Sequence, residues 1–145
     1  MYEGGCSCGQ VRYRLTTGPM FVNCCHCTQC QKQSASAFGL AVPVPREVLS
    51  VDGPTSYWSR STYSGGRTDC HFCTECGTRV FHARAGGTGF VTVKASAFDD
   101  TADLEPRAHL WVSMKLPWTL IPEGVEQYGT QPADLRAWRD GFLRP

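Results

Sequence analysis

The chain has 145 residues, of which 41% are hydrophobic and 19% charged, and its formal net charge is +1. This length suits one domain with its own core, so we expect a single domain over residues 1–145. The composition excludes long disordered tracts, and the near-neutral charge with scattered arginines makes a nucleic-acid partner unlikely. No apolar stretch reaches the roughly twenty residues that a membrane span needs, so we expect a soluble protein.

Short strands joined by turns are predicted for most of the sequence. Fifteen glycines and nine prolines interrupt runs of alternating or β-branched residues, which indicates a mainly β fold. In the first run, Val11, Tyr13 and Leu15 alternate with Arg12 and Arg14, so one face can be buried. The predicted strands are 10–15, 38–44, 56–59, 79–82, 90–94 and 109–113, with turns at 52–54 and 86–87.

The C-terminal stretch follows a different period. Leu135, Trp138 and Phe142 recur at helical spacing after Pro132, a residue that is favourable in the first turn of a helix. We therefore expect one short helix that ends near Gly141. Its apolar stripe is predicted to pack in the core rather than to bind a cofactor.

Seven of the nine cysteines fall into three tight groups. The groups are Cys6 with Cys8, Cys25 with Cys27 and Cys30, and Cys73 with Cys76. Thiols one or two residues apart do not readily bridge each other, but a short turn can direct them toward one tetrahedral cation. The spacing therefore predicts a zinc protein.

The number of cysteines predicts how the groups combine. A structural Zn²⁺ needs four ligands, whereas a catalytic one keeps three and an open position. The two pairs, Cys6/Cys8 and Cys73/Cys76, then form one site, and the triplet Cys25, Cys27 and Cys30 forms the other.

The residues after each group support this division. Gly9 and Gly77 follow the two pairs, where a residue without Cβ lets the chain turn beneath a metal. The triplet has no such glycine, and its closely spaced ligands predict a compact loop that leads into a short helix through residues 31–33.

Three alternatives stay open at this point. Nine cysteines could form disulfides in a secreted protein, although residues 1–20 lack a signal-like apolar stretch. An iron–sulfur cluster is a second alternative, but its commoner spacings place two residues between early cysteines. Cys24 could compete with Cys25 as a ligand; otherwise Cys24 and Cys70 are expected to be small buried hydrophobes.

Five motifs occur in the order and spacing of one known family. They are residues 4–13 (GGCSCGQVRY), 23–30 (NCCHCTQC), 36–39 (SAFG), 72–78 (FCTECGT) and 106–118, which contains PRAHLWV and KLPW. These motifs resemble the glutathione-dependent formaldehyde-activating enzyme family, and the same domain is similar to the core of centromere protein V. The resemblance runs from about Gly4 to about Tyr128.

The resemblance implies a β-tent zinc fold of antiparallel sheets, to which the C-terminal helix is added. It implies a structural zinc on Cys6, Cys8, Cys73 and Cys76. It also implies a catalytic zinc on Cys25, Cys27 and Cys30, two zinc ions per chain in all. The implied activity is that of a carbon–sulfur lyase or synthase that adds the thiol of glutathione to formaldehyde, giving S-(hydroxymethyl)glutathione.

Several other residues are candidates for this chemistry. His26 is the first candidate proton donor, although we favour a role in which it points away from the metal and hydrogen-bonds the backbone. His71 and His82 flank the late cysteine pair and could orient a thiolate. Lys32 and Arg12 could meet the carboxylates of glutathione. Position 31 is Gln, where relatives commonly carry a basic residue.

A second class of function is a non-catalytic module, in which both metals only stabilise the fold and a surface binds a protein or a polyanion. Reduced thiols are needed at both sites on either interpretation, so we expect a cytoplasmic protein.

Overall fold

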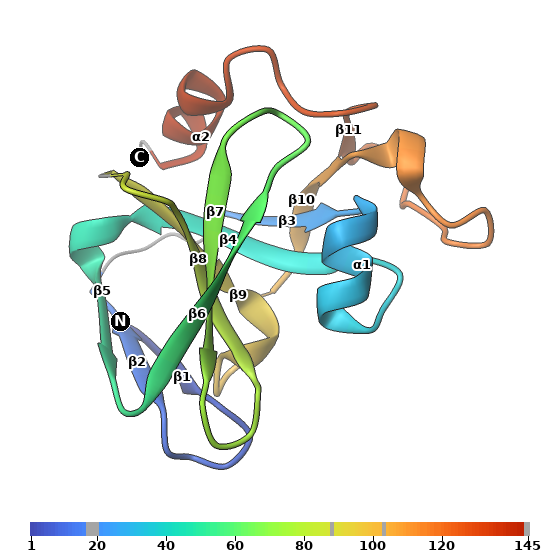
Figure 1. The fold of residues 1–145 in the computed structure, drawn as a ribbon. Coiled ribbons are helices and arrows are strands. Elements are labelled where there is room, and N and C mark those ends of the chain that lie inside the picture. The colour runs from blue at the N-terminus through green and yellow to red at the C-terminus, as the bar shows by residue number, and fades with distance from the viewer. Residues whose placement is uncertain (17–20, 88, 103, 144–145) are drawn as a thin grey trace. The chain divides into compact units, whose positions relative to one another are not determined.

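The computed structural model describes residues 1–16, 21–87, 89–102 and 104–143, with the backbone alone at position 143 (Figure 1). The chain forms two compact units, Met1–Gly18 with Pro43–Asp103 and Pro19–Val42 with Leu104–Pro145. Each unit combines segments that are distant in sequence. The cysteine pairs belong to the first unit and the triplet to the second.

The first unit contains two sets of antiparallel strands. Three strands pair in the order β1-β2-β5 and four in the order β9-β8-β7-β6. Their bounds are β1 Tyr2–Gly5, β2 Arg12–Leu15, β5 Leu49–Asp52, β6 Thr55–Ser61, β7 Arg67–Cys73, β8 Arg79–Arg84 and β9 Phe90–Lys94. Two 3₁₀ turns, Arg46–Val48 and Ala95–Ala97, follow β4 (Gly39–Pro45) and β9.

The alternation predicted for the first strand is confirmed. Val11, Tyr13 and Leu15 are 0%, 3% and 0% exposed, so this face lies in the core of the first unit. Arg12 and Arg14 are exposed and form ion pairs with Asp99 and Glu3. One face of β2 is therefore apolar and the other ionic, as period-two patterning dictates.

The second unit has a mixed sheet. Strand β10 (Pro106–Leu110) runs parallel to both β3 (Val22–Cys25) and β11 (Glu126–Gln127), whereas β3 is antiparallel to β4 (Gly39–Pro45). Helix α1 (Thr28–Ser34) follows β3, a short 3₁₀ turn (Val112–Met114) follows β10, and α2 (Leu135–Leu143) ends the chain. Strand β4 continues in sequence into the first unit.

Helix α2 packs as its apolar spacing predicts. The ring of Phe142 stacks on Phe21 with centroids 3.9 Å apart, and Trp138 meets Phe21 edge-on at 4.8 Å. The stripe is therefore a packing surface. The helix begins later than expected, because Asp134 caps it by accepting a hydrogen bond from Ala137 N, and it continues past the expected end near Gly141.

The mainly β class is confirmed, and so is the short helix through residues 31–33, although it begins at Thr28 and therefore already includes Cys30. The prediction of a strand over 109–113 is wrong beyond Leu110, because Trp111 adopts the left-handed conformation (φ 59°) and the chain turns into a 3₁₀ segment. The strand predictions missed β1, β3, β5, β7 and β11. Within the described residues, no helix is long and apolar enough to cross a membrane.

Candidate metal centres

Two hairpin turns of the first unit carry the cysteine pairs. Cys6 and Cys8 lie between β1 and β2, Cys73 ends β7, and Cys76 lies between β7 and β8. The two turns are closed alike, since Cys6 N donates to Val11 O at 3.0 Å and Cys73 N donates to Thr78 O at 3.0 Å. We call Cys6, Cys8, Cys73 and Cys76 the four-thiol cluster.

Both turns need a glycine directly after the second cysteine. Gly9 and Gly77 have φ values of 80° and 74°, in the region that strains residues with a Cβ. Their amides donate to the carbonyls of Cys6 and Cys73 at 3.1 and 2.9 Å. The sequence pattern of two cysteines followed by glycine therefore has a backbone cause.

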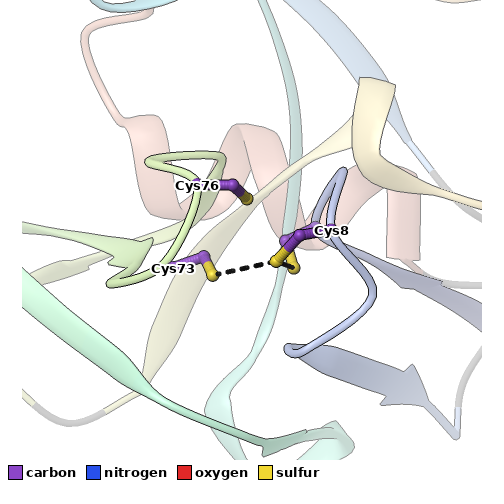
Figure 2. A group of neighbouring side chains, drawn as sticks. Cys8, Cys73 and Cys76 are labelled. Atoms are coloured by element: carbon purple, nitrogen blue, oxygen red, sulfur yellow. Dashed lines mark hydrogen bonds between the residues drawn. The ribbon is translucent and has the colours of Figure 1, made fainter.

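The sulfurs of the four-thiol cluster have the spacing of metal ligands. All four lie within 4.8 Å of one another, with Cys6 and Cys8 Sγ 3.4 Å apart and Cys8 and Cys73 Sγ 3.8 Å apart. Four sulfurs at the usual Zn–S distance on a tetrahedron are about 3.8 Å apart. Figure 2 shows the side chains of Cys8 and Cys73 directed toward each other from the two turns. The cluster can hold one tetrahedral metal ion.

Hydrogen bonds favour the thiolate at Cys76 and Cys6. At Cys8 the amide of Gln10 acts in the same direction, but the neighbouring thiols and burial outweigh it and raise the pKa to about 12. The hydroxyl and amide of Thr78 lower the pKa of Cys76 to about 5. Burial raises the pKa of Cys6, but hydrogen bonds from the Val11 amide and from neighbouring thiols outweigh burial and the net shift is downward. Several thiolates in one place repel each other, and a soft divalent cation removes that repulsion.

The second group forms where β3 passes into α1. Cys25 ends β3, Cys27 is the N-cap of α1, and Cys30 lies in its first turn. Cys27 Sγ accepts the amide hydrogen of Cys30 at 3.4 Å, which fixes the Cys27 side chain at the start of the helix. The three sulfurs lie within 4.8 Å of one another. We call these residues the three-thiol cluster.

This cluster differs from the first in ligand number and in burial. Cys27 and Cys30 are 5% and 8% exposed, whereas Cys25 is half-buried. Cys27 and Cys30 raise the pKa of Cys25 far above 9.0, because three thiolates this close repel each other strongly. Three thiols that can hold a metal leave a tetrahedral ion with one further position, which is the arrangement of zinc sites that bind substrate.

His26 lies between two of these cysteines in sequence, but its side chain turns inward. It is 0% exposed, and its Nε2 lies 2.8 Å from Nδ1 of His109 on β10. Its amide donates to Leu110 O at 2.9 Å and its carbonyl accepts from Gln31 Nε2 at 2.6 Å. Burial, followed by His109 and Lys115, lowers the His26 pKa to about 4. The expected inward orientation is found, but the ring bonds to a second histidine and not to the backbone.

The remaining candidates are held by other contacts. His71 stacks on Phe81 with ring centroids 4.2 Å apart, and His82 Nε2 accepts from Arg79 Nη2 at 2.6 Å. The guanidinium of Arg12 binds Asp99, with Nη1 and Oδ1 2.9 Å apart. The thiol of Cys24 is 1% exposed and lies outside the three-thiol cluster, and burial raises its pKa to about 12. None of the nine cysteines, all of which belong to the described residues, forms a disulfide, so the disulfide alternative is wrong.

The fold and the two clusters define a mainly β protein with two groups of cysteines that can each hold a metal ion. The model of the glutathione-dependent formaldehyde-activating enzyme family matches residues 1–114. A putative glutathione-dependent formaldehyde-activating enzyme of Halomonas elongata is 32% identical over 137 residues, covering 88% of this chain and 84% of that protein. An uncharacterized lyase of Schizosaccharomyces pombe is 24% identical over 97 residues, which are 67% of this chain and 68% of that protein.

The chain belongs to the glutathione-dependent formaldehyde-activating enzyme family. A solved structure of a Rhodobacter sphaeroides protein agrees with the fold. It matches with a TM-score of 0.54 at 20% identity and covers 70% of this chain and 91% of the other.

Proposed function

We propose that the three-thiol cluster holds Zn²⁺ and promotes the addition of a thiol such as glutathione to formaldehyde, giving S-(hydroxymethyl)glutathione. The observation that carries this proposal is the difference between the two clusters. Four thiols can close a tetrahedral site, whereas Cys25, Cys27 and Cys30 leave a position for a substrate sulfur. Family membership and the name of the Halomonas elongata relative support the choice of substrates.

The four-thiol cluster has the structural role in this proposal. Cys6 and Cys8 come from one hairpin turn and Cys73 and Cys76 from another, so a shared Zn²⁺ joins the two turns. The second site supplies the chemistry: a bound Zn²⁺ favours the thiolate form of a coordinated thiol, which is the nucleophile.

The reaction balances without a further reactant. The thiol loses its proton, its sulfur forms a bond to the carbonyl carbon, and the π electron pair of the carbonyl moves to oxygen. A proton equivalent to the one lost then reaches that oxygen, so one thiol and one formaldehyde give one hydroxymethyl thioether. Such a reaction needs a thiolate, open access for formaldehyde to the thiolate sulfur, and a path that brings the proton to the carbonyl oxygen.

Contacts within the chain hold the cysteines of this site in place. The N-cap contact from Cys30 N to Cys27 Sγ fixes the Cys27 side chain at the start of α1, and Cys25 is the most exposed of the three cysteines. His26 does not donate the proton in our proposal, because its ring is buried and hydrogen-bonded to His109. Its role is to hold the segment between Cys25 and Cys27 in place. The free thiols that both sites need suit the reducing cytoplasm.

The test is the rate of exchange between free glutathione and its hydroxymethyl adduct, measured by NMR with ¹³C-formaldehyde, because the adduct also forms without an enzyme. The zinc-loaded chain should exceed the uncatalysed rate, and Cys27→Ser should return the rate to that background. Cys24→Ala is the matched control, since this buried cysteine of β3 lies outside both clusters. Equal rates for the chain and the background, with both metals bound, would refute the proposal in favour of a binding module.

A further inference from the structure

The side chain of Gln31 joins helix α1 to the 3₁₀ turn that follows β10. Its Nε2 lies 2.6 Å from His26 O and 3.0 Å from Met114 O. Both partners are backbone carbonyls, so each must accept one N–H of the amide, and the amide oxygen cannot take the place of this nitrogen. One side chain therefore connects the segment between Cys25 and Cys27 with a turn 83 positions after Gln31.

The turn that ends at Met114 is itself firmly held. The amides of residues 111–113 donate to carbonyls of residues 128–130 at 2.6, 3.0 and 3.1 Å, and Met114 N donates to Trp111 O at 3.0 Å. Trp111 has a φ of 59°, a conformation that is unfavourable for a bulky residue and persists only where surrounding contacts enforce it. The carbonyl of Met114 is thus a fixed point for the Gln31 amide.

The carbonyl of His26 controls the position of Cys27. A planar peptide bond joins the two residues, so the direction of the His26 carbonyl determines where the Cα of Cys27 lies. The amide of His26 donates to Leu110 O at 2.9 Å, its ring lies 2.8 Å from His109, and its carbonyl accepts from Gln31. Loss of the Gln31 amide would therefore loosen the peptide that leads into Cys27.

We propose that Gln31 is a positioning residue of the three-thiol cluster, whose amide fixes the peptide between His26 and Cys27 and thereby raises the affinity of the cluster for Zn²⁺. The inference rests on the proposed function, because it takes this cluster as a zinc site. Ligands that are already in place lose less freedom when the metal binds. Replacing a residue that orients a metal ligand typically weakens metal binding by about 10–100-fold.

Two substitutions separate the hydrogen bonds of Gln31 from its bulk. Gln31→Met keeps a side chain of similar length but removes the donor to both carbonyls. Gln31→Glu keeps the shape of the side chain but places a carboxylate against two carbonyl oxygens, which repel it. Gln29→Met and Gln29→Glu are the matched controls, because Gln29 is a half-buried glutamine of the same helix, two positions before the residue that holds both carbonyls.

The test measures how readily each cluster of the full chain gives up zinc. The zinc-loaded protein would be mixed with increasing concentrations of a zinc chelator and then treated briefly with iodoacetamide, which alkylates cysteines that no longer bind metal. Mass spectrometry of the digested protein then reports each cysteine separately. The four-thiol cluster serves as the reference within the same molecule, because its cysteines belong to other segments of the chain.

In Gln31→Met, the three-thiol cluster should lose zinc at a chelator concentration about tenfold below that of the unmodified chain, and in Gln31→Glu at a lower one still. The four-thiol cluster should lose zinc at the same chelator concentration in all the proteins. Both Gln29 variants should behave as the unmodified chain does. A change confined to one cluster distinguishes positioning from a general loss of stability, which would affect both clusters.

Three results would contradict the inference or its basis. If both Gln31 variants keep the zinc affinity of the three-thiol cluster, or if both clusters weaken together, the inference is overturned and the proposed function stands. If Cys25, Cys27 and Cys30 of the unmodified chain are alkylated as fast with zinc as without it, the cluster holds no zinc and the proposed function fails with the inference. A selective loss of zinc in the Gln31 variants, in a chain that does not accelerate the exchange reaction, would refute the proposed function alone.

Discussion

Removing one exposed ligand of the four-thiol cluster should destabilise the protein by far more than its own contacts explain. Cys76 is exposed, so Cys76→Ser removes little packing, and the serine hydroxyl can still meet Thr78. A surface substitution of this kind ordinarily changes stability very little. Any large effect must therefore come from the loss of a metal bound by the cluster.

The expected loss of stability follows from the length of the loop that a metal bound by the four-thiol cluster would close. Cys8 and Cys73 are 65 positions apart. A cross-link that closes a loop of this length restricts the unfolded chain by about 4 kcal/mol in the chain-entropy model. In a protein of this size, a loss of that order lowers the melting temperature by about 8–16 °C.

The assay is thermal unfolding followed by circular dichroism, in zinc and again with excess chelator, with Glu75→Gln as a control from the same turn. In zinc, Cys76→Ser should melt far below both the unmodified chain and the control. In chelator, the three proteins should melt together. A Cys76→Ser protein that keeps its melting temperature in zinc would refute the cross-link, and so would a difference that persists in chelator.

Three further predictions concern residues outside the two clusters. His109→Leu leaves the buried Nε2 of His26 without its partner, which should lower the free energy of unfolding in urea by about 1–3 kcal/mol. The double variant His26→Leu/His109→Leu should lose less of this free energy than the two single variants lose together. Simple additivity of the two losses would contradict this. Ala35 closes α1 with φ 49°, so Ala35→Gly should raise stability by about 0.5–1 kcal/mol, and a loss of stability would be the contrary result. Burial holds the pKa of His82 well below 6.5, so the unfolded chain takes up a proton that the folded chain does not. The neutral His82 side chain therefore contributes fully to the free energy of unfolding above about pH 6.5. On acidification below that pH the contribution falls, by up to about 1.4 kcal/mol per pH unit. His82→Gln, whose amide oxygen can still accept from Arg79, should show a shallower loss at low pH, and equal slopes would contradict the assignment.

Local spacing was the reliable source of prediction. The cysteines of each group are close in sequence, so a turn brings their sulfurs together whatever the rest of the chain does. The alternation in β2 and the helical period in α2 are local in the same way. These patterns were sufficient for the mainly β class and for the three-thiol cluster, whereas the joining of the two cysteine pairs into one cluster was predicted from the four ligands that a structural Zn²⁺ needs.

Local patterns of this kind did not predict the contacts between segments that are distant in sequence. His26 and His109 are 83 positions apart, and they meet because β3 and β10 pair in parallel, a pairing that no turn signal marks. Strand β1 contains Gly4, which lacks strand propensity. It is required there because a Cβ would lie 2.2 Å from Ala97 O.

Native mass spectrometry of the freshly purified chain, with and without reduced glutathione, tests the central claim most directly because it counts metals and bound thiols together. Our account predicts two zinc ions per chain, one in Cys27→Ser, and a glutathione adduct on the two-zinc form alone. A single zinc in the unmodified chain, or an adduct that Cys27→Ser retains, would contradict the assignment of the thiol to the three-thiol cluster.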